Sequence, residues 1–391
     1  MSTETATAAD DVFAELVGQD AVVNQLRSVV AAANPTHAWL FTGPPGSGRS
    51  NAARAFAAAL NCTEGQGCGR CRSCRLVASD SHPAVSLVST ENVSYRIEDV
   101  RDLISTAQDR PQGARWRVIV IEDADRMTER ATNVLLKSIE EPPPQTIWVL
   151  CAPSPADVLV TIRSRCRHVS LRVPPTEAVA DLLVTRDGLN RQQAEFAARV
   201  AQNHIGVARR LAGSAEARER REKVVSLPIR VRSASQAVLA AAELVSVAEA
   251  EAQAEAESRL AQEEAGLRRS LGLELEEKIP PKLRAQFKRL QEESARRAKR
   301  SVTDSLDRTL IDLTTVYRDV LSLKLQAGAE LINEHLRGDL EQLAEALSPE
   351  QSLACLDALS DARIRIRQNV PAQLAMEALM MNLIPRRHRL R

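Results

Sequence analysis

The stretch that decides the fold is residues 38–50, which read Ala-Trp-Leu-Phe-Thr-Gly-Pro-Pro-Gly-Ser-Gly-Arg-Ser. Its first five residues form an apolar run of strand length, and the glycine-rich turn that follows leads into the alanine-rich residues 51–60, which have helical character. A strand, a glycine-rich loop and a helix in this order are typical of a phosphate-binding loop, where backbone N–H groups and the helix N-terminus face an anion. The sequence therefore predicts the first strand–loop–helix unit of a nucleotide-binding α/β domain.

This loop departs from the usual phosphate-binding pattern at one position. Ser50 stands where a hydroxyl binds Mg²⁺, but Arg49 stands where a lysine usually reaches the β- and γ-phosphates of ATP. Because a guanidinium is longer, planar and forked, arginine is not a simple replacement for lysine in a tight site. Binding of ATP and Mg²⁺ is therefore left open, and a glycine-rich turn without a ligand is the alternative. The candidate contact residues are Gly43, Pro44, Gly46, Ser47, Gly48, Arg49 and Ser50.

Residues 12 to about 172 alternate between helical and strand patterns. Apolar runs at residues 117–121, 146–151 and 168–171 predict further buried strands. Alternation of this kind is typical of a doubly wound α/β layer built on a parallel sheet.

The strand at residues 117–121 ends in a pair of acidic residues, Glu122 and Asp123. In nucleotide sites an aspartate at this place holds Mg²⁺ and a following glutamate polarises the attacking water. Here the two acids stand in the reverse order, so they are candidate members of a degenerate nucleotide site. An acidic pair at a strand end without such a role is the alternative.

Composition limits the class of protein. Among 391 residues, 52 basic and 51 acidic side chains nearly balance, which argues against an electrostatic hold on DNA by the whole chain. Aromatic residues make up only 3%, so the cores must be built from aliphatic side chains, as in helices and buried parallel sheets. We find no signal peptide and no apolar run of about 18 residues that could span a membrane, so we expect the cytoplasm and no membrane partner.

Changes in pattern along the chain predict four segments. A Pro174-Pro175 pair ends the α/β pattern, and the remainder of the chain has helical spacing. The predicted segments are a disordered N-terminus at 1–11, an α/β domain at 12–173, a helical lid at 174–232, and an all-helical C-terminal domain at 233–391 that carries a charged helical hairpin at about 249–300.

Four of the seven cysteines lie within one short segment, as Cys62, Cys68, Cys71 and Cys74. Thiolates at these spacings can surround a tetrahedral Zn²⁺, and four protein ligands leave no open position for catalysis. The spacing therefore predicts a structural zinc site. An iron–sulfur cluster and free thiols are the alternatives.

Four motifs occur together and in order: Phe13-x4-Gly18-Gln19, His37-Ala-Trp-Leu-Phe41, Leu135-Leu-Lys-Ser-Ile-Glu-Glu-Pro-Pro143 and Ser164-Arg165-Cys166. Together they resemble the bacterial clamp-loader subunits of DNA polymerase III, which are AAA+ proteins. The resemblance implies an AAA+ module, a helical lid and a C-terminal collar that packs into a hetero-pentameric ring with tau/gamma and delta subunits. It also implies Zn²⁺ on the four cysteines, and action on the sliding clamp and primed DNA through the complex.

The resemblance assigns roles to two arginines. Arg165 matches the arginine finger that crosses a subunit interface to a neighbour's ATP, where such a guanidinium is worth roughly 10³ to 10⁵ in rate in other systems. A surface basic cluster with Arg163 and Arg167 is the alternative. Arg209 matches the lid arginine that the family calls sensor 2.

Within the family, the pattern resembles delta-prime members. The sensor 1 position falls on Ala152 or Pro153, and neither side chain can orient water or a phosphate. Together with Arg49 and the reversed acids, this implies a non-motor subunit with weak or absent ATPase activity and no recognisable polymerase site. The alternatives are an active tau/gamma-type motor and a zinc-dependent DNA-binding protein. The charged segment at 249–300 is better interpreted as a solvated helix face than as a DNA contact.

Overall fold

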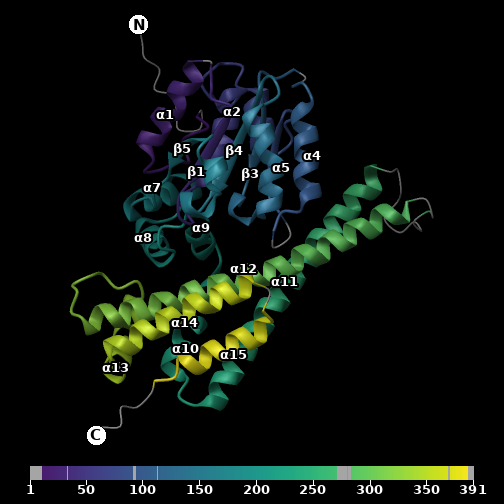
Figure 1. Ribbon diagram of the computed structural model, residues 1–391. Coiled ribbons are helices and arrows are strands. Elements are labelled where there is room, and N and C mark those ends of the chain that lie inside the picture. Colours follow the sequence, from purple (N-terminus) through teal and green to yellow (C-terminus); the bar gives the residue numbers. More distant parts are fainter. Residues whose placement is uncertain are drawn as a thin grey trace. The chain divides into compact units, whose positions relative to one another are not determined.

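A computed structural model of the chain shows two compact units (Figure 1). The first holds the described residues up to Ser214, and the second holds those from Ala215 onward. The predicted disordered N-terminus lies outside the described residues, apart from Asp11. The structure describes residues 11–32, 34–90, 94–111, 113–270, 280, 283–368 and 370–385.

A five-stranded sheet forms the centre of the N-terminal unit. All four neighbouring strand pairs are parallel, and the strand order is β2-β3-β4-β1-β5. Leu40 of β1 pairs with Leu150 on one side and with His168 on the other, so β1 is an inner strand. The predicted doubly wound parallel sheet is confirmed. The strands are β1 (Ala38–Thr42), β2 (Val85–Val88), β3 (Arg117–Ile121), β4 (Thr146–Ala152) and β5 (Arg167–Ser170).

Helices cover both faces of this sheet, because alternate residues of each strand point to opposite sides. Trp39 and Phe41 of β1 belong to a core with α1 (Asp20–Ala31) and α2 (Arg49–Leu60). Ala38 and Leu40 belong to a second core with α4 (Ile97–Gln108) and α5 (Glu129–Glu140). Both faces of β1 are therefore buried. The glycine-rich loop that follows β1 begins at the carboxyl end of this buried strand.

Three short helices complete the N-terminal unit, and their positions follow the predicted helical pattern. They are α7 (Thr176–Asp187), α8 (Arg191–Val200) and α9 (Ile205–Gly213). Helix α10 (Ala215–Arg230), which the sequence grouped with this lid, packs instead in the C-terminal unit. The physical reason is its apolar side: Val224 and Val225 join the core of that unit.

The C-terminal unit is entirely helical in its described part. Leu306, Leu310, Leu313 and Val316 of α12 are fully buried, as their helical spacing predicted. No helix among the described residues is long and apolar enough to cross a membrane. Besides α10, the unit contains α11 (Ala234–Ser270), α12 (Arg284–Lys324), α13 (Arg337–Ala346), α14 (Pro349–Arg367) and α15 (Ala372–Asn382).

Helices α11 and α12 form the predicted charged hairpin, and Figure 1 shows them side by side beyond α14 and α15. The amide of Gln291 donates to Glu264 at 3.2 Å, and the Ser294 hydroxyl donates to the Ala256 carbonyl at 3.4 Å. Arg297 of α12 pairs with a glutamate of α11. Several charges of the insertion thus hold the two arms together. Most of the connection between the two helices, including Pro281, lies outside the described residues.

A buried polar network connects α12 to the loop that precedes α13. The Asp319 carboxylate, fully buried, accepts from the backbone N–H groups of Ile332 at 3.0 Å and Asn333 at 2.8 Å. Asn333 in turn accepts from the buried Arg221 guanidinium at 2.7 Å, which also donates to Asp312 at 3.2 Å. Burial lowers the pKa of Arg221, and the charge of Asp312 opposes that shift.

We expect Asp319→Asn to lower the free energy of unfolding by about 3 kcal/mol or more, because it leaves buried donors facing an amide and removes one charge from a buried ionic network. Urea denaturation followed by circular dichroism measures this change. Asp361→Asn, the same substitution on an exposed position of α14, is the control and should change stability by about 0.5 kcal/mol or less. Equal effects of the two substitutions would show that the network is not a stability determinant.

Candidate functional site

The glycine-rich loop lies between the end of β1 and the start of α2, as the sequence predicted. Gly46 and Gly48 both have a left-handed backbone, with φ of 86° and 85°, and Gly48 is the N-cap of α2. The Gln19 amide bridges the loop to the end of the sheet, because it contacts the carbonyls of Ser47 at 3.3 Å and Arg172 at 2.5 Å. The backbone of a phosphate-binding loop is thus retained.

Arg49 does not extend away from this loop. Its guanidinium donates a hydrogen bond to the carbonyl of Gly43, at the start of the same loop. Burial and the charge of Asp123 raise the pKa of Asp125, while the charge of Arg49 acts in the opposite direction. Arg49 therefore lies near the acidic segment after β3, with part of its donor capacity used by its own backbone.

The two predicted acids directly follow β3. Asp123 has a left-handed backbone with φ of 52° and lies 3.7 Å from the Arg126 guanidinium. Burial raises the pKa of the Cys151 thiol on β4, and the charges of Glu122 and Asp123 raise it further. The acids therefore lie near the end of β4, where Ala152 is fully buried and offers no polar side chain.

The lid contacts the loop through a residue that the sequence did not single out. A Cβ added to Gly46 would lie 2.8 Å from the Cα and 2.9 Å from the Cβ of His204, so this histidine packs directly on the loop. Its Nδ1 accepts from the N–H of Val207 at 3.4 Å and caps α9. Arg209, the predicted sensor 2 residue, pairs with Asp187 of α7 at 3.0 Å.

Residues around the loop leave buried polar atoms without partners. Among the described residues, the Oγ of Ser47, the Oδ1 of Asp125 and the Oδ1 of Asn203 are buried and have no hydrogen bond. Buried polar atoms without a hydrogen-bond partner are uncommon in folded proteins. In this arrangement Arg49 is bonded to the Gly43 carbonyl, and His204 packs against Gly46.

Arg165 lies between the short helix α6 (Val160–Arg163) and β5, and its side chain is 40% exposed. One guanidinium nitrogen lies 2.6 Å from the Glu140 carboxylate, and another donates to the Thr161 carbonyl at 2.8 Å. The flanking arginines are directed elsewhere: Arg163 donates to the Pro155 carbonyl, and Arg167 stacks 5.0 Å from the centre of the Trp39 ring. The three arginines therefore make separate contacts in this structure.

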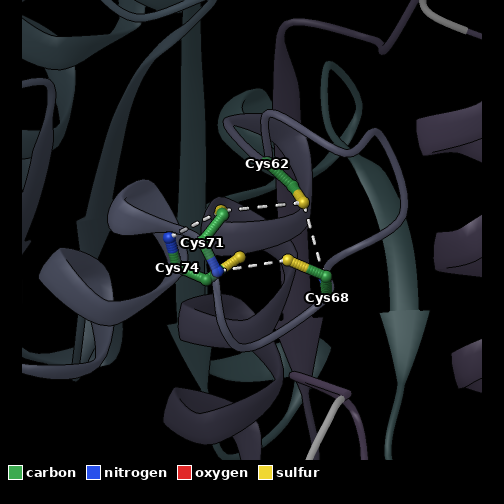
Figure 2. Close-up of side chains that lie close together, drawn as sticks. All are labelled: Cys62, Cys68, Cys71 and Cys74. Atoms are coloured by element: carbon green, nitrogen blue, oxygen red, sulfur yellow. Dashed lines mark hydrogen bonds between the residues drawn. The ribbon is translucent and has the colours of Figure 1, made fainter. Parts of the chain in front are cut away.

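The four cysteines of the predicted zinc site face one another (Figure 2). Their sulfur atoms all lie within 4.8 Å, and those of Cys62 and Cys71 are 4.0 Å apart. A tetrahedral Zn²⁺ with bonds of about 2.3 Å needs sulfur atoms about 3.8 Å apart. The geometry therefore fits zinc held by Cys62, Cys68, Cys71 and Cys74.

Backbone hydrogen bonds favour the thiolate, the form that binds metal, at Cys62 and Cys71, whereas burial raises the pKa values of Cys68 and Cys74. The N–H groups of Cys68, Cys71 and Cys74 donate to cysteine sulfur atoms at 3.3–3.4 Å. Burial raises the pKa of Cys71, but hydrogen bonds from Cys74 and Thr63 outweigh it and lower that pKa to about 6. The module is also closely packed, because a Cβ on Gly67 would lie 2.6 Å from Val12.

Comparison with known proteins agrees with this fold and these motifs. A family model described as DNA polymerase III, delta subunit, matches residues 18–175. DNA polymerase III subunit gamma/tau of Mycobacterium bovis is 37% identical over 44% of the chain, and subunit delta' of Bacillus subtilis is 31% identical over 54%. The matches span only 30% and 64% of these relatives. A crystal structure of a gamma subunit-related protein from Thermotoga maritima covers 92% of the chain at 17% identity, with a TM-score of 0.41.

The parallel sheet, its phosphate-binding loop and the lid define the N-terminal unit as an AAA+ module. The family match and the relatives narrow this class to one group of AAA+ proteins. By these matches the N-terminal unit is similar to the bacterial clamp-loader subunits of DNA polymerase III.

Proposed function

We propose that this protein is a non-motor, delta-prime-type subunit of the DNA polymerase III clamp loader. It occupies a hetero-pentameric ring with tau/gamma and delta subunits in the cytoplasm and helps to load the sliding clamp onto primed DNA. The observation that carries the proposal is the hydrogen bond from Arg49 to Gly43, which turns the only loop cation back onto the loop. A motor would need that cation at the phosphates of ATP.

In this proposal the protein has little or no ATPase activity of its own and serves the polymerase as an accessory subunit. Arg165 supplies an arginine finger to a neighbouring ATPase subunit. Support for this role comes from its exposure and from its contacts with Glu140 and Thr161, which hold the guanidinium at the surface of the domain. The four-cysteine zinc is structural, because no coordination position is left open.

ATP hydrolysis by the purified chain, alone and mixed with tau/gamma and delta subunits, tests the proposal. We expect turnover at background level for the chain alone and an increase in DNA-stimulated turnover when it joins the other subunits. Robust hydrolysis by the chain alone would support the alternative, an active tau/gamma-type motor, which the 37% identity to gamma/tau relatives favours.

Restoring the usual lysine should not by itself create a motor. We expect Arg49→Lys to leave ATP turnover near background, because Glu122 and Asp123 stay in reverse order and Ala152 offers no sensor side chain. A phosphate-release assay measures the turnover, and Arg54→Lys on the same helix is the matched control. Turnover by the Arg49→Lys variant at the rate of a tau/gamma subunit would contradict the non-motor assignment.

A further inference from the structure

Arg165 and Glu140 form an ion pair at the surface of the N-terminal unit, and both partners are attached to the buried core. Glu140 is the last residue of α5 and directly follows Ile139. Arg165 lies three residues after Ile162 of α6. Ile139 and Ile162 belong to the same core and are 0% and 1% exposed. Core packing therefore fixes the backbone on both sides of the ion pair.

The guanidinium of Arg165 is held by acceptors from two elements. Its Nη2 lies 2.6 Å from the Glu140 carboxylate. Its Nη1 donates to the Thr161 carbonyl at 2.8 Å and to the Ser164 hydroxyl at 3.2 Å. Thr161 and Ser164 belong to the same turn of chain as the arginine itself. Among these three acceptors, Glu140 is the one that a second element contributes.

This arrangement leaves donors of the guanidinium available. A guanidinium carries five N–H groups, one on Nε and two on each terminal nitrogen. Among the described residues, the Nε of Arg165 has no hydrogen-bond partner, and its Nη2 contacts only Glu140. The edge formed by Nε and Nη2 is one of the two-donor edges with which arginine binds a phosphate. The side chain is thus held in place while this edge keeps donors for a ligand.

The stability of the fold gives no reason for a carboxylate at position 140. A negative charge at the carboxyl end of a helix is disfavoured by the helix dipole, and Glu140 is the last residue of α5. Both partners of the ion pair are 40% exposed, and exposed ion pairs contribute little to stability. What the pair does determine is the direction of the Arg165 side chain.

We propose that Glu140 is a positioning residue for Arg165 and sets the orientation in which the guanidinium meets a phosphate of the neighbouring subunit's ATP. The inference rests on the proposed arginine-finger role and adds the residue that prepares the finger. A misplacement of about 1 Å can cost about 10²-fold in rate. Without Glu140, the guanidinium is held only by acceptors from its own turn of chain.

The test measures DNA-stimulated ATP hydrolysis by the reconstituted clamp loader. The finger-dependent rate is the difference between the wild-type complex and the Arg165→Ala complex at saturating ATP. We expect Glu140→Ala to lower this rate by about tenfold or more with KM for ATP unchanged, because the finger acts on the transition state. In a complex that already carries Arg165→Ala, Glu140→Ala should cause no further loss, because it acts through the same arginine.

Two conservative variants separate the reach of the side chain from its charge. Glu140→Gln keeps an oxygen acceptor at the same distance without the charge, so it should retain most of the finger-dependent rate. Glu140→Asp keeps the charge but withdraws it by one methylene group, so it should lose most of that rate. Circular dichroism and zinc content show whether each variant is folded, and Glu140→Asp replaces Glu140→Ala if the alanine variant is not. Glu141→Ala, which removes the adjacent exposed carboxylate, is the matched control and should match wild type.

A wild-type rate for the Glu140→Ala complex, while the Arg165→Ala complex is slow, would overturn the inference and leave the finger role intact. Faster hydrolysis by both Glu140→Ala and Glu140→Gln would also overturn it, because the carboxylate would then restrain the finger. So would a double variant that is slower than Arg165→Ala alone, since Glu140 would then act by another route. Wild-type rates for both Arg165→Ala and Glu140→Ala would instead contradict the arginine-finger role itself.

Discussion

Arg165→Ala should slow DNA-stimulated ATP hydrolysis by the reconstituted clamp loader and slow clamp loading still more, while folding, zinc content and ring assembly stay intact. A guanidinium supplied to a neighbour's γ-phosphate acts on the transition state, where comparable fingers contribute roughly 10³–10⁵ in rate at one site. Only one of several ATP sites loses its finger, so total hydrolysis falls in part. We expect clamp loading to fall further than total hydrolysis.

The structure predicts that this substitution is tolerated by the fold. Arg165 and Glu140 are each 40% exposed, and an exposed ion pair contributes about 0–1 kcal/mol. Arg163→Ala, two residues away on the same exposed segment, is the matched control. Fluorescence assays of clamp loading on primed DNA compare the two variants. If the Arg165→Ala complex loads at the normal rate, Arg165 is part of an ordinary surface and the assisting role is wrong.

The second large effect is expected from loss of the metal. The purified protein should contain about one Zn²⁺ per chain, and Cys71→Ser should release it and lower the melting temperature. Structural zinc contributes about 10–16 kcal/mol in small zinc-finger peptides. Here the module also packs against Ala58 and Val77, so its loss should loosen α2 as well as the cysteine segment.

Elemental analysis and a thermal melt measure this effect, with Cys166→Ser as a control thiol outside the cluster. The Cys166 thiol is not one of the four sulfur atoms that lie within 4.8 Å of one another. Protein without metal, or protein with the visible absorption of an iron–sulfur cluster, would contradict the zinc assignment.

The sequence predicted those elements whose signal lies within a short stretch of residues, such as an apolar run or a set of closely spaced cysteines. The apolar run at residues 117–121 is β3, and the four cysteines that the spacing grouped lie together in space. Strand β2 was not predicted, because it has four residues, all only partly buried, and carries no strong apolar signal.

Two features escaped prediction because they depend on contacts between distant residues. The sequence placed α10 in the lid, but its partners are on α12, where Arg221 meets Asp312. His204 is a single histidine before a helix, and its contact with the phosphate loop becomes visible only because Gly46 packs against it in the structure. A histidine at an N-cap position beside a lid motif was the one available signal. Neither contact follows from periodicity or from composition.

The place of β1 between β4 and β5 has a consequence for a chain emerging from a ribosome. This apolar strand is made early, yet both of its neighbours lie beyond residue 145, so the centre of the sheet cannot close until most of the N-terminal unit has been synthesised. The cysteine module closes within residues 62–74 and can bind zinc while β3 is still being made. At that stage the nascent chain can thus have its cysteine segment closed while β1 is still an unpaired apolar strand, and unpaired strand edges of this kind are prone to aggregation.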